Sequence, residues 1–464
     1  MSGQSVTVAF VDMATYDELE VILYGGDDAT AYFVRETRKS TWFSIIPVQL
    51  TRSTGTADFG QQWSSSISRA GDYLLSAWLR IGIPAVTLAA AGTGTVVAGS
   101  RLRWTRNLGH NIISECTVSF NDLVAARFDN YFLDFWAAFT VDASKQVAYD
   151  NMIGNVPELT SEQVAPGATL PARMLNVPLP FWFCRDSGVA LPTAALPYNE
   201  MRINFNFRGL NELLVHENSA VAVGTSPNIP YNLTDIVGTA PTLNSPAVWG
   251  EYAIVSNDER QRMGCAARDI VIEQAQTAPV QTFTAATAGA AQSVDIRFSH
   301  AVKALFFGAR NKTIASDWSN YTAASADPSG ANVNYNTSGA SDPILQTSLV
   351  YENSNRLNVM GSDYFSLVNP YYHAPVVPTE TGYHCYSYAL DFCNLDPQGS
   401  TNYGRLTNVS ISPSPSAAAV AGNGATGATK ATGQDYVQTY DFICVALAYN
   451  VIRISGGALG FPIL

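Results

Sequence analysis

The chain has 464 residues, of which 47% are hydrophobic and 14% are charged, so it is long enough for two or three domains with large cores. No apolar run approaches the roughly 18–20 residues that span a bilayer, so we expect a soluble globular protein. The formal net charge of −12, without a compensating cluster of Lys and Arg, argues against nucleic acid as a direct partner.

The cysteines lack the paired spacing of a disulfide framework, and the N-terminus lacks the basic and apolar segments of a secretory signal. We therefore expect a cytosolic chain with reduced thiols. Without such a signal, five glycosylation sequons are interpreted as loop composition. The cysteines are Cys116, Cys184, Cys265, Cys385, Cys393 and Cys444, and the sequons begin at Asn232, Asn311, Asn320, Asn336 and Asn408.

Residues 1–30 are predicted to form an arm that carries one short amphipathic helix. Asp12 or Thr15 can cap this helix, and the glycine pair at 25–26 can end it. Such an arm needs a surface to pack on. The apolar residues on one face of the helix are Tyr16, Leu19, Ile22 and Leu23.

From residue 31 the pattern changes to short β runs separated by polar residues and glycine, which predicts a sandwich or a barrel. The run at 201–207 alternates apolar and polar residues, as a strand with one wet face does. The polar segment 211–246 is interpreted as a loop. The strands predicted in this half are 31–34, 42–49, 59–67, 73–83, 102–105, 112–120, 179–183, 201–207 and 249–255.

The strongest helical pattern covers residues 121–139, where Asn121 or Asp122 can cap a helix. We interpret this helix as packed in the core, with a ligand-binding face as the alternative. An exposed part of the face would mark a subunit contact. Its apolar residues, mostly three or four apart, are Val124, Phe128, Phe132, Phe135, Trp136 and Phe139.

The charged segment 257–263 is predicted to be a short capped helix at a domain boundary, and the rest of the chain is again all-β. Three segments of the first half resemble three of the second in the same order, which suggests two copies of one unit. The pairs are 63–81 with 293–307, 196–207 with 403–411, and 249–256 with 440–449. The second-half strands are predicted at 269–274, 294–298, 301–307, 345–351, 383–390, 405–411 and 440–454.

One segment, Arg-Asp-Ser-Gly at 185–188, could be the nucleophile turn of a two-barrel serine protease. That chemistry needs small residues on both sides of the serine and a histidine base earlier in the chain. His110 is the only upstream histidine, and His384 follows the serine, in the wrong order. We therefore interpret the segment as a turn between strands, with Ser187 outside hydrogen-bond reach of a histidine.

Three further patterns resemble functional sites without the context those sites need. Gly-Asn-Gly-Ala-Thr-Gly at 422–427 matches the dinucleotide fingerprint, but no strand and helix flank it. His384, Cys385 and Cys393 do not make a closed tetrahedral metal set. Acidic pairs at 27–28 and 258–259 stand beside a helix end and a helix start, and a glycosidase pair could also be far apart in sequence. We assign no catalytic, cofactor-binding or metal residue.

A collinear series of motifs resembles the major capsid proteins of nucleocytoplasmic large DNA viruses, and of iridoviruses in particular. The series covers nearly the whole chain, and departures are concentrated at 84–100, 156–170, 211–247, 278–291, 312–343 and 412–434. Its motifs are FVDMATYDELE, YGGDDATAYFV, FGQQW, SRAGDYLLSAWL, RWTRNLGHNII, AYDNMIGN, LPTAALPYNEMRINF, EYAIVSNDERQRM, RDIVIEQAQTAPV, RFSHAVKALFF, SLVYEN, GYHCYSYALDF, GSTNYGRLTN and GFPIL.

The resemblance implies an all-β double jelly roll: an arm at 1–30, a first jelly roll at 31–256, a linker helix at 257–264 and a second jelly roll at 265–464. It implies a structural protein, not an enzyme and without cofactors, whose homotrimers tile an icosahedral capsid. Neighbouring capsomers, minor capsid proteins and penton proteins would be its partners, with the arm near an internal membrane. Its location would be the virion, after synthesis and assembly in the host cytoplasm. The alternative is a carbohydrate-binding or carbohydrate-active jelly-roll protein.

Overall fold

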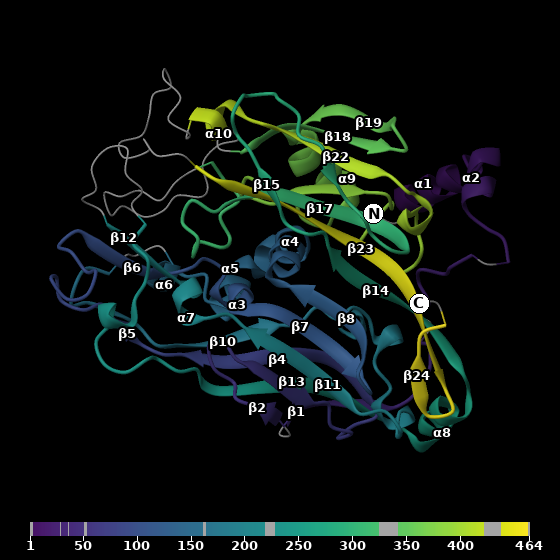
Figure 1. Ribbon diagram of the computed structural model, residues 1–464. Coiled ribbons are helices and arrows are strands. Elements are labelled where there is room, and N and C mark those ends of the chain that lie inside the picture. Colours follow the sequence, from purple (N-terminus) through teal and green to yellow (C-terminus); the bar gives the residue numbers. More distant parts are fainter. Residues whose placement is uncertain are drawn as a thin grey trace. The chain divides into compact units, whose positions relative to one another are not determined.

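A computed structural model describes residues 3–27, 29–35, 37–50, 53–160, 164–218, 228–323, 342–421 and 438–462 (Figure 1). The chain divides into two compact units, Met1–Trp42 and Phe43–Leu464. The smaller unit contains helices α1 (Gly3–Ala14) and α2 (Glu18–Leu23), where the sequence predicted one helix.

Helix α2 begins at a capping box. The Asp17 side chain accepts a hydrogen bond from the Glu18 backbone N–H at 2.8 Å, and the Glu20 carboxylate accepts one from the Asp17 N–H at 3.0 Å. The predicted caps Asp12 and Thr15 are therefore wrong, because these residues lie at the end of α1.

The end of α2 is confirmed at the glycine pair. Gly25 and Gly26 follow the last helical turn with φ of 121° and 108°, values that side chains disfavour. Residues 31–34, predicted as a strand, form a turn.

The larger unit begins with a sandwich of two antiparallel sheets (Figure 1). The first sheet has the order β1 (Phe43–Leu50), β13 (Asn244–Val255), β4 (Tyr73–Ile83), β10 (Arg173–Pro178). The second has the order β2 (Ser53–Gly55), β3 (Gln62–Ser66), β11 (Met201–Phe207), β7 (Ile113–Phe120), β8 (Leu123–Asp129). Strand β11 alternates buried and half-buried residues, which confirms the prediction that its polar residues lie on one, more exposed side.

A second sandwich repeats this order. One sheet runs β14 (Arg268–Thr277), β23 (Tyr440–Ser455), β17 (Ala301–Asn311), β20 (His384–Ser387). The other runs β16 (Val294–Asp295), β22 (Val409–Pro415), β18 (Ile344–Tyr351), β19 (Ser354–Gly361). Apart from the short β2, each sandwich thus has two four-stranded sheets in the jelly-roll arrangement, and the strands in all three predicted repeat pairs occupy matching positions.

Short strands extend the sandwiches. In the first, β5 (Val86–Thr87) pairs with β9 (Thr169–Leu170), and β6 (Ser100–Trp104) pairs with β12 (Leu214–Asn218). In the second, β15 (Gln281–Phe283) and β24 (Ala458–Gly460) pair with β23, and β21 (Thr401–Asn402) pairs with β17. Because β12 lies within 211–246, that segment is not the continuous loop that the sequence predicted.

The predicted helix at 121–139 is wrong in its first part. Asn121 and Asp122 have left-handed φ angles of 48° and 67° and form a two-residue hairpin turn between β7 and β8. Helix α4 (Asn130–Thr140) starts only after Asp129, whose carboxylate accepts the Phe132 backbone N–H at 2.9 Å. The second sandwich has the same kind of two-residue hairpin turn, with left-handed residues at 352–353 between β18 and β19.

The predicted strand at 179–183 is also wrong. Backbone hydrogen bonding there forms three short 3-10 helices, η1 (Trp182–Cys184), η2 (Ser187–Val189) and η3 (Thr193–Ala195). Prolines at 178, 180 and 192 remove backbone donors that a strand would use. Phe181, Trp182 and Phe183 are nevertheless all buried. The apolar run therefore correctly indicated burial, but it did not indicate strand conformation.

Helices occupy the connections between strands. In the first sandwich these are α3 (Leu108–Asn111), α5 (Ala143–Ile153), α6 (Pro157–Thr160), α7 (Leu210–Leu213) and η4 (Leu233–Asp235). The helix predicted at 257–263 is confirmed as α8 (Asn257–Cys265). The second sandwich has η6 (Tyr364–Val368), α9 (Asn369–His373), η7 (Tyr403–Arg405) and α10 (Ala417–Ala421). Among the described residues, no helix has the length and apolar character to cross a membrane.

The buried apolar residues form two clusters. The first fills the first sandwich and continues through α4 to the outer face of the β14–β23–β17–β20 sheet, where it includes Phe306, Val445 and Leu447. The second fills the interior of the second sandwich and includes Phe307, Phe365 and the interior residues of β23. Figure 1 shows α4 between the two sets of strands. The junction between the sandwiches is therefore a core region and not a flexible linker.

Candidate functional site at the junction of the two sandwiches

Helix α4 anchors the junction with aromatic side chains from its buried face. Phe135 stacks on Phe306 of β17 with ring centroids 6.3 Å apart, and it meets Tyr383 edge-on at 5.6 Å. One turn later Phe139 also stacks on Phe306, at 5.5 Å. All four rings are buried, so the helix joins the sandwiches by apolar burial and aromatic packing.

A polar network surrounds Asp134 on the same helix. Its Oδ1 atom accepts hydrogen bonds from Asn107 Nδ2 at 3.0 Å and lies 2.7 Å from His110 Nδ1. Its Oδ2 atom accepts the hydroxyl protons of Ser319 at 2.7 Å and Tyr321 at 3.1 Å. Because those two hydroxyls come from the second sandwich, a carboxylate of the first holds the two together through charge-assisted hydrogen bonds.

The loop after β17 extends across to the first sandwich. Trp318 lies between two guanidinium groups, with Arg208 Cζ 3.6 Å and Arg310 Cζ 3.8 Å from its ring centroid. Its indole N–H donates to the Glu212 carbonyl at 2.8 Å. Burial lowers the pKa of Arg208 to about 10, against the raising effects of Tyr131 and Glu212. This stack pins the loop by cation–π contacts and one directed hydrogen bond.

A buried ion cluster also crosses the junction, beside Trp136 of α4. Glu273 of β14 forms ion pairs with Arg185 of the first sandwich, at 2.7 Å, and with Lys303 of β17. Arg185 also lies over the Trp136 ring, with Cζ 3.7 Å from the centroid. Burial lowers the pKa of Lys303, and the Glu273 carboxylate opposes that shift. One carboxylate therefore compensates two buried cations.

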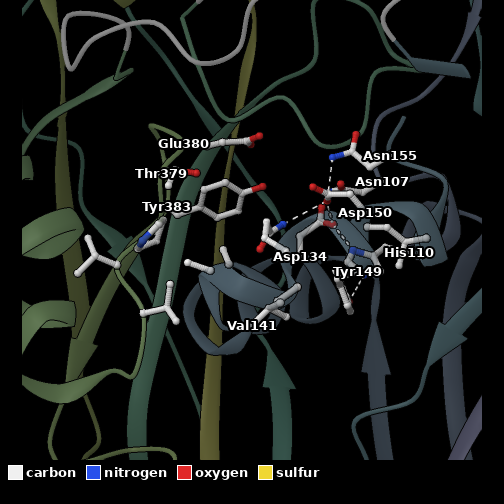
Figure 2. Close-up of a pocket in the computed structure, with 18 residues that line it drawn as sticks. Asn107, His110, Asp134, Val141, Tyr149, Asp150, Asn155, Thr379, Glu380 and Tyr383 are labelled. Atoms are coloured by element: carbon white, nitrogen blue, oxygen red, sulfur yellow. Dashed lines mark hydrogen bonds and ion pairs between the residues drawn. The ribbon is translucent and has the colours of Figure 1, made fainter. Parts of the chain in front are cut away.

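A cleft of about 300 Å³ opens beside this junction (Figure 2). Figure 2 shows Thr379, Glu380 and Tyr383 of the second sandwich on one side, and His110 and Asp150 of the first on the other. Burial raises the pKa of Asp150, although hydrogen bonds from the Asn155 and Gln146 amides lower it. The remaining lining residues are Asn107, Asp134, Ala137, Ala138, Val141, Ala143, Tyr149, Ile153 and 376–378.

His110 is part of this cleft and not of a protease site. Its Nε2 atom lies 2.6 Å from the Tyr149 hydroxyl, which continues the chain from Asp134. Burial raises the pKa of Tyr149 far above its ordinary value, so this hydroxyl stays protonated and is a poor nucleophile. The arrangement fixes the position of α4 against α3 and α5 through hydrogen bonds.

The 185–188 segment was predicted as a turn between strands, but it instead connects the 3-10 helices η1 and η2, with a turn at Arg185. The Asp186 carboxylate accepts the Gly188 backbone N–H at 3.3 Å and begins η2. His384 lies elsewhere, within 2.9 Å of Asp342 and 3.1 Å of Ser362. Both partners contact the same Nε2 atom, whereas a catalytic relay uses one ring nitrogen for the carboxylate and the other for the hydroxyl.

The other sequence-predicted candidates are scattered. Within the described residues, no group of three potential metal ligands comes together. All six cysteines are free, and burial raises the pKa of the Cys184 and Cys444 thiols to about 12. Asp258 and Glu259 lie in the first turn of α8, where the helix dipole favours them. The glycine motif at 422–427, residue 28 and the sequon at 336 lie outside the described residues.

Sequence reasoning missed most residues of the junction, although one signal was present. Lys303 and Arg310 lie inside an otherwise apolar strand, which is unusual unless a partner compensates the charge. Arg185 stands in the sequence only as part of the protease-like motif. Asp134 and Trp318 carry no local signal, because their partners are distant in sequence.

Two family models match the chain. "Major capsid protein N-terminus" covers residues 31–255, and "Large eukaryotic DNA virus major capsid protein" covers residues 259–460. The chain belongs to this family of viral major capsid proteins. It is therefore a structural protein of a large DNA virus and not an enzyme, and the virion capsid is its location.

Relatives from iridoviruses match this capsid protein over its full length. It is 60% identical to the major capsid protein of Costelytra zealandica iridescent virus, with all of both chains covered. It is 58% identical to that of Invertebrate iridescent virus 6, again over all of both chains. The protein from Rana tigrina ranavirus is 42% identical, with 100% of this chain and 99% of the relative covered.

Solved structures confirm the double jelly-roll fold. A quasi-atomic model of the PBCV-1 virus capsid aligns with a TM-score of 0.71 at 23% identity, covering 94% of this chain and 100% of that chain. The Faustovirus major capsid protein aligns with a TM-score of 0.66 at 12% identity, covering 97% of each chain. None of these relatives supports the carbohydrate-active alternative.

Proposed function

We propose that three copies of this capsid protein form a homotrimeric capsomer with a pseudo-hexagonal outline, and that these capsomers tile an icosahedral shell over an internal membrane. The repeated sheet order carries the proposal. Each chain supplies two sandwiches of the same topology, so three chains supply six similar units. Cyclic association of three chains then gives a nearly hexagonal unit.

A ring of six similar units requires a fixed geometry between the two sandwiches of each chain. The buried aromatic contacts of α4 supply apolar stabilisation there. The Asp134 network and the Glu273 cluster add directional contacts that specify one arrangement. These features support a rigid tile that keeps its shape when capsomers pack side by side.

We propose that the chain divides into an arm at 1–30, a first jelly roll at 31–256, a linker helix at 257–264 and a second jelly roll at 265–464. Arg260 of the linker helix donates to both carboxylate oxygens of Asp72, at 2.8 and 2.9 Å. Asp72 also accepts the Val255 backbone N–H at 3.0 Å, and the hydrogen bond from Arg260 lowers its pKa. The linker is thereby tied to the last strand of the first sandwich.

The N-terminal arm is proposed to contact minor capsid proteins and the internal membrane. Its described apolar side chains are largely exposed, including Phe10, Leu19, Ile22 and Leu23. Exposed apolar residues of this density are typical of a segment that is buried against a partner. Penton proteins and neighbouring capsomers complete the proposed set of partners.

The shell is proposed to enclose its genome without binding it directly. With a net charge of −12, the protein lacks the excess of cations that neutralises phosphates. Synthesis and assembly in the host cytoplasm fit the free thiols, since disulfides are rare in that reducing compartment. Purified protein that retained DNA at physiological salt would contradict the charge argument.

The oligomeric state tests the main proposal. Light scattering coupled to size-exclusion chromatography should give three times the 49.9 kDa of one chain. Negative-stain images of that peak should show pseudo-hexagonal particles. A monomer at micromolar concentration, above all one that bound a glycan, would overturn the capsomer and revive the carbohydrate-binding alternative.

A further inference from the structure

The two sandwiches can be aligned strand by strand at a shared irregularity. The β4–β13 register shifts between Glu251 and Tyr252, and the β17–β23 register shifts between Val302 and Ala304. Counting from this β-bulge, Trp78 of β4 occupies the position that Phe306 has in β17. Their ladder partners on the neighbouring strand also correspond, Trp249 for Trp78 and Val445 for Phe306.

The two corresponding faces differ in what covers them. Phe306 and Val445 are completely buried because α4 packs on the outer face of their sheet. Trp78 and Trp249 stack on each other with centroids 6.3 Å apart and 13° between their planes, yet both stay partly exposed. The first sandwich thus presents an aromatic platform, Trp78 and Trp249, where the second receives a helix.

The helical segment that corresponds to α4 lies after β19. Residues 364–373, η6 followed by α9, occupy the same connection in the second sandwich that begins with α4 in the first. Phe365 buries its ring against Phe307, with centroids 5.2 Å apart, and Asn369 Oδ1 accepts the Ser387 backbone N–H at 3.1 Å. These contacts hold the segment in place from one side.

The other side of this segment is apolar and exposed. Tyr371 and Tyr372 are each 72% exposed, and their rings meet edge-on at 5.2 Å. Leu367 and Val368 precede them by four residues and are also exposed. The spacing repeats that of the α4 residues 135, 136 and 139, which contact the second sandwich. We name Leu367, Val368, Tyr371 and Tyr372 the tyrosine ridge.

We propose that the tyrosine ridge of one copy docks onto the Trp78–Trp249 platform of a second copy, and so repeats between chains the contact that α4 makes within a chain. The inference rests on the proposed trimer and names the surfaces that form it. A second copy is the occupant because each chain carries both halves of the contact, one on each sandwich. Such a head-to-tail contact generates a ring when the rotation closes.

The chemistry of the two surfaces fits a specific interface. Tyrosine and tryptophan are enriched at the centres of protein interfaces, because they bury a large apolar area and keep a polar atom available. The Ser76 hydroxyl donates to Glu251 at 3.0 Å beside the platform, so that a carboxylate lies within reach of a docked tyrosine hydroxyl. The edge strand β1 adds exposed Phe43 and Ile45 to the same face.

A charge-insertion experiment on the full chain tests the proposal. The ridge variant Tyr371→Lys/Tyr372→Lys and the platform variant Trp249→Lys should each lose the trimer in light scattering. The control Val147→Lys changes a residue that is 74% exposed on α5, outside both surfaces, and should keep the trimer. Mixing the two variants should yield dimers and no trimers, because a pair with one chain of each variant retains one intact contact and has no further intact surface for a third chain.

Footprinting supplies a second measurement that does not depend on a platform substitution. Oxidation of Trp78 and Trp249, followed by mass spectrometry, should rise severalfold in the ridge variant relative to the wild-type trimer. Thermal unfolding checks that the ridge variant folds. If the wild type is a trimer and the ridge variant stays one, the docking inference is wrong while the capsomer stands. A monomeric wild type would instead overturn the proposed function itself.

Discussion

The two jelly rolls share one topology, but their hydrophobic cores differ in extent. The second sandwich has an interior cluster of its own, built around Phe307 and Phe365. The cluster of the first sandwich continues through Phe135 onto the outer face of the β14–β23–β17–β20 sheet of the second. The same connection, after the fifth of the eight jelly-roll strands (β8 or β19), carries a helix buried in the junction in one case and an exposed ridge in the other. A duplicated unit can therefore serve both as a domain interface and as a candidate subunit interface.

The largest effect is expected where the first core crosses the junction. Phe135→Ala should lower the free energy of unfolding by about 4 kcal/mol, because it empties a buried aromatic site between the sandwiches. Calorimetry should then resolve two transitions, since the sandwiches lose their shared core. The control Phe365→Ala removes a ring from the second interior and should keep a single transition. A single transition in Phe135→Ala at the wild-type temperature would show that Phe135 does not couple the two cores.

A smaller loss is expected from the buried ion cluster. Glu273→Gln leaves Arg185 and Lys303 without a compensating carboxylate and should cost about 3 kcal/mol in urea unfolding. Asp269→Asn provides a matched control on the same strand, because its ion pair with Arg453 is exposed to solvent. Equal midpoints for the two variants would mean that the cluster does not hold the sandwiches together.

The smallest effect concerns pH and the first sandwich alone. Burial lowers the pKa of His216 from its ordinary 6.5, against the raising effect of Asp235. Below pH 6.5 the unfolded chain therefore binds a proton that the folded chain does not, so stability falls on acidification, by at most about 1.4 kcal/mol per pH unit.

His216→Gln should remove this dependence between pH 7.5 and 5.5, measured as the shift of the urea midpoint. His300→Asn is the control, since asparagine tolerates the left-handed φ of 63° at this turn. A wild-type slope that survived in His216→Gln would assign the acid sensitivity to other groups.

Local sequence patterns predicted most strands, because the alternation of apolar and polar residues along a strand is visible in the sequence itself. Strand β4 has its predicted bounds, and β11 has both its predicted bounds and its predicted wet face. The wrong predictions are in segments where buried residues do not follow the periodicity of the secondary structure that forms. Leu179 and the aromatic residues 181–183 are buried without pairing in a sheet, and a hairpin turn at 121–122 interrupts an apparently continuous helical pattern. Local propensity does not resolve such cases, since packing overrides it.

By itself the sequence determined the all-β class, the duplication, the linker helix and the resemblance to a capsid family, because each depends on residues close together or on collinear motifs. Only the tertiary structure decided that α4 lies between the sandwiches and that Asp134, Trp318 and Glu273 join them. Their partners are separated by tens to hundreds of residues, so no local pattern marks them. The unequal covering of two equivalent sheet faces likewise became visible only when the strands were placed in register.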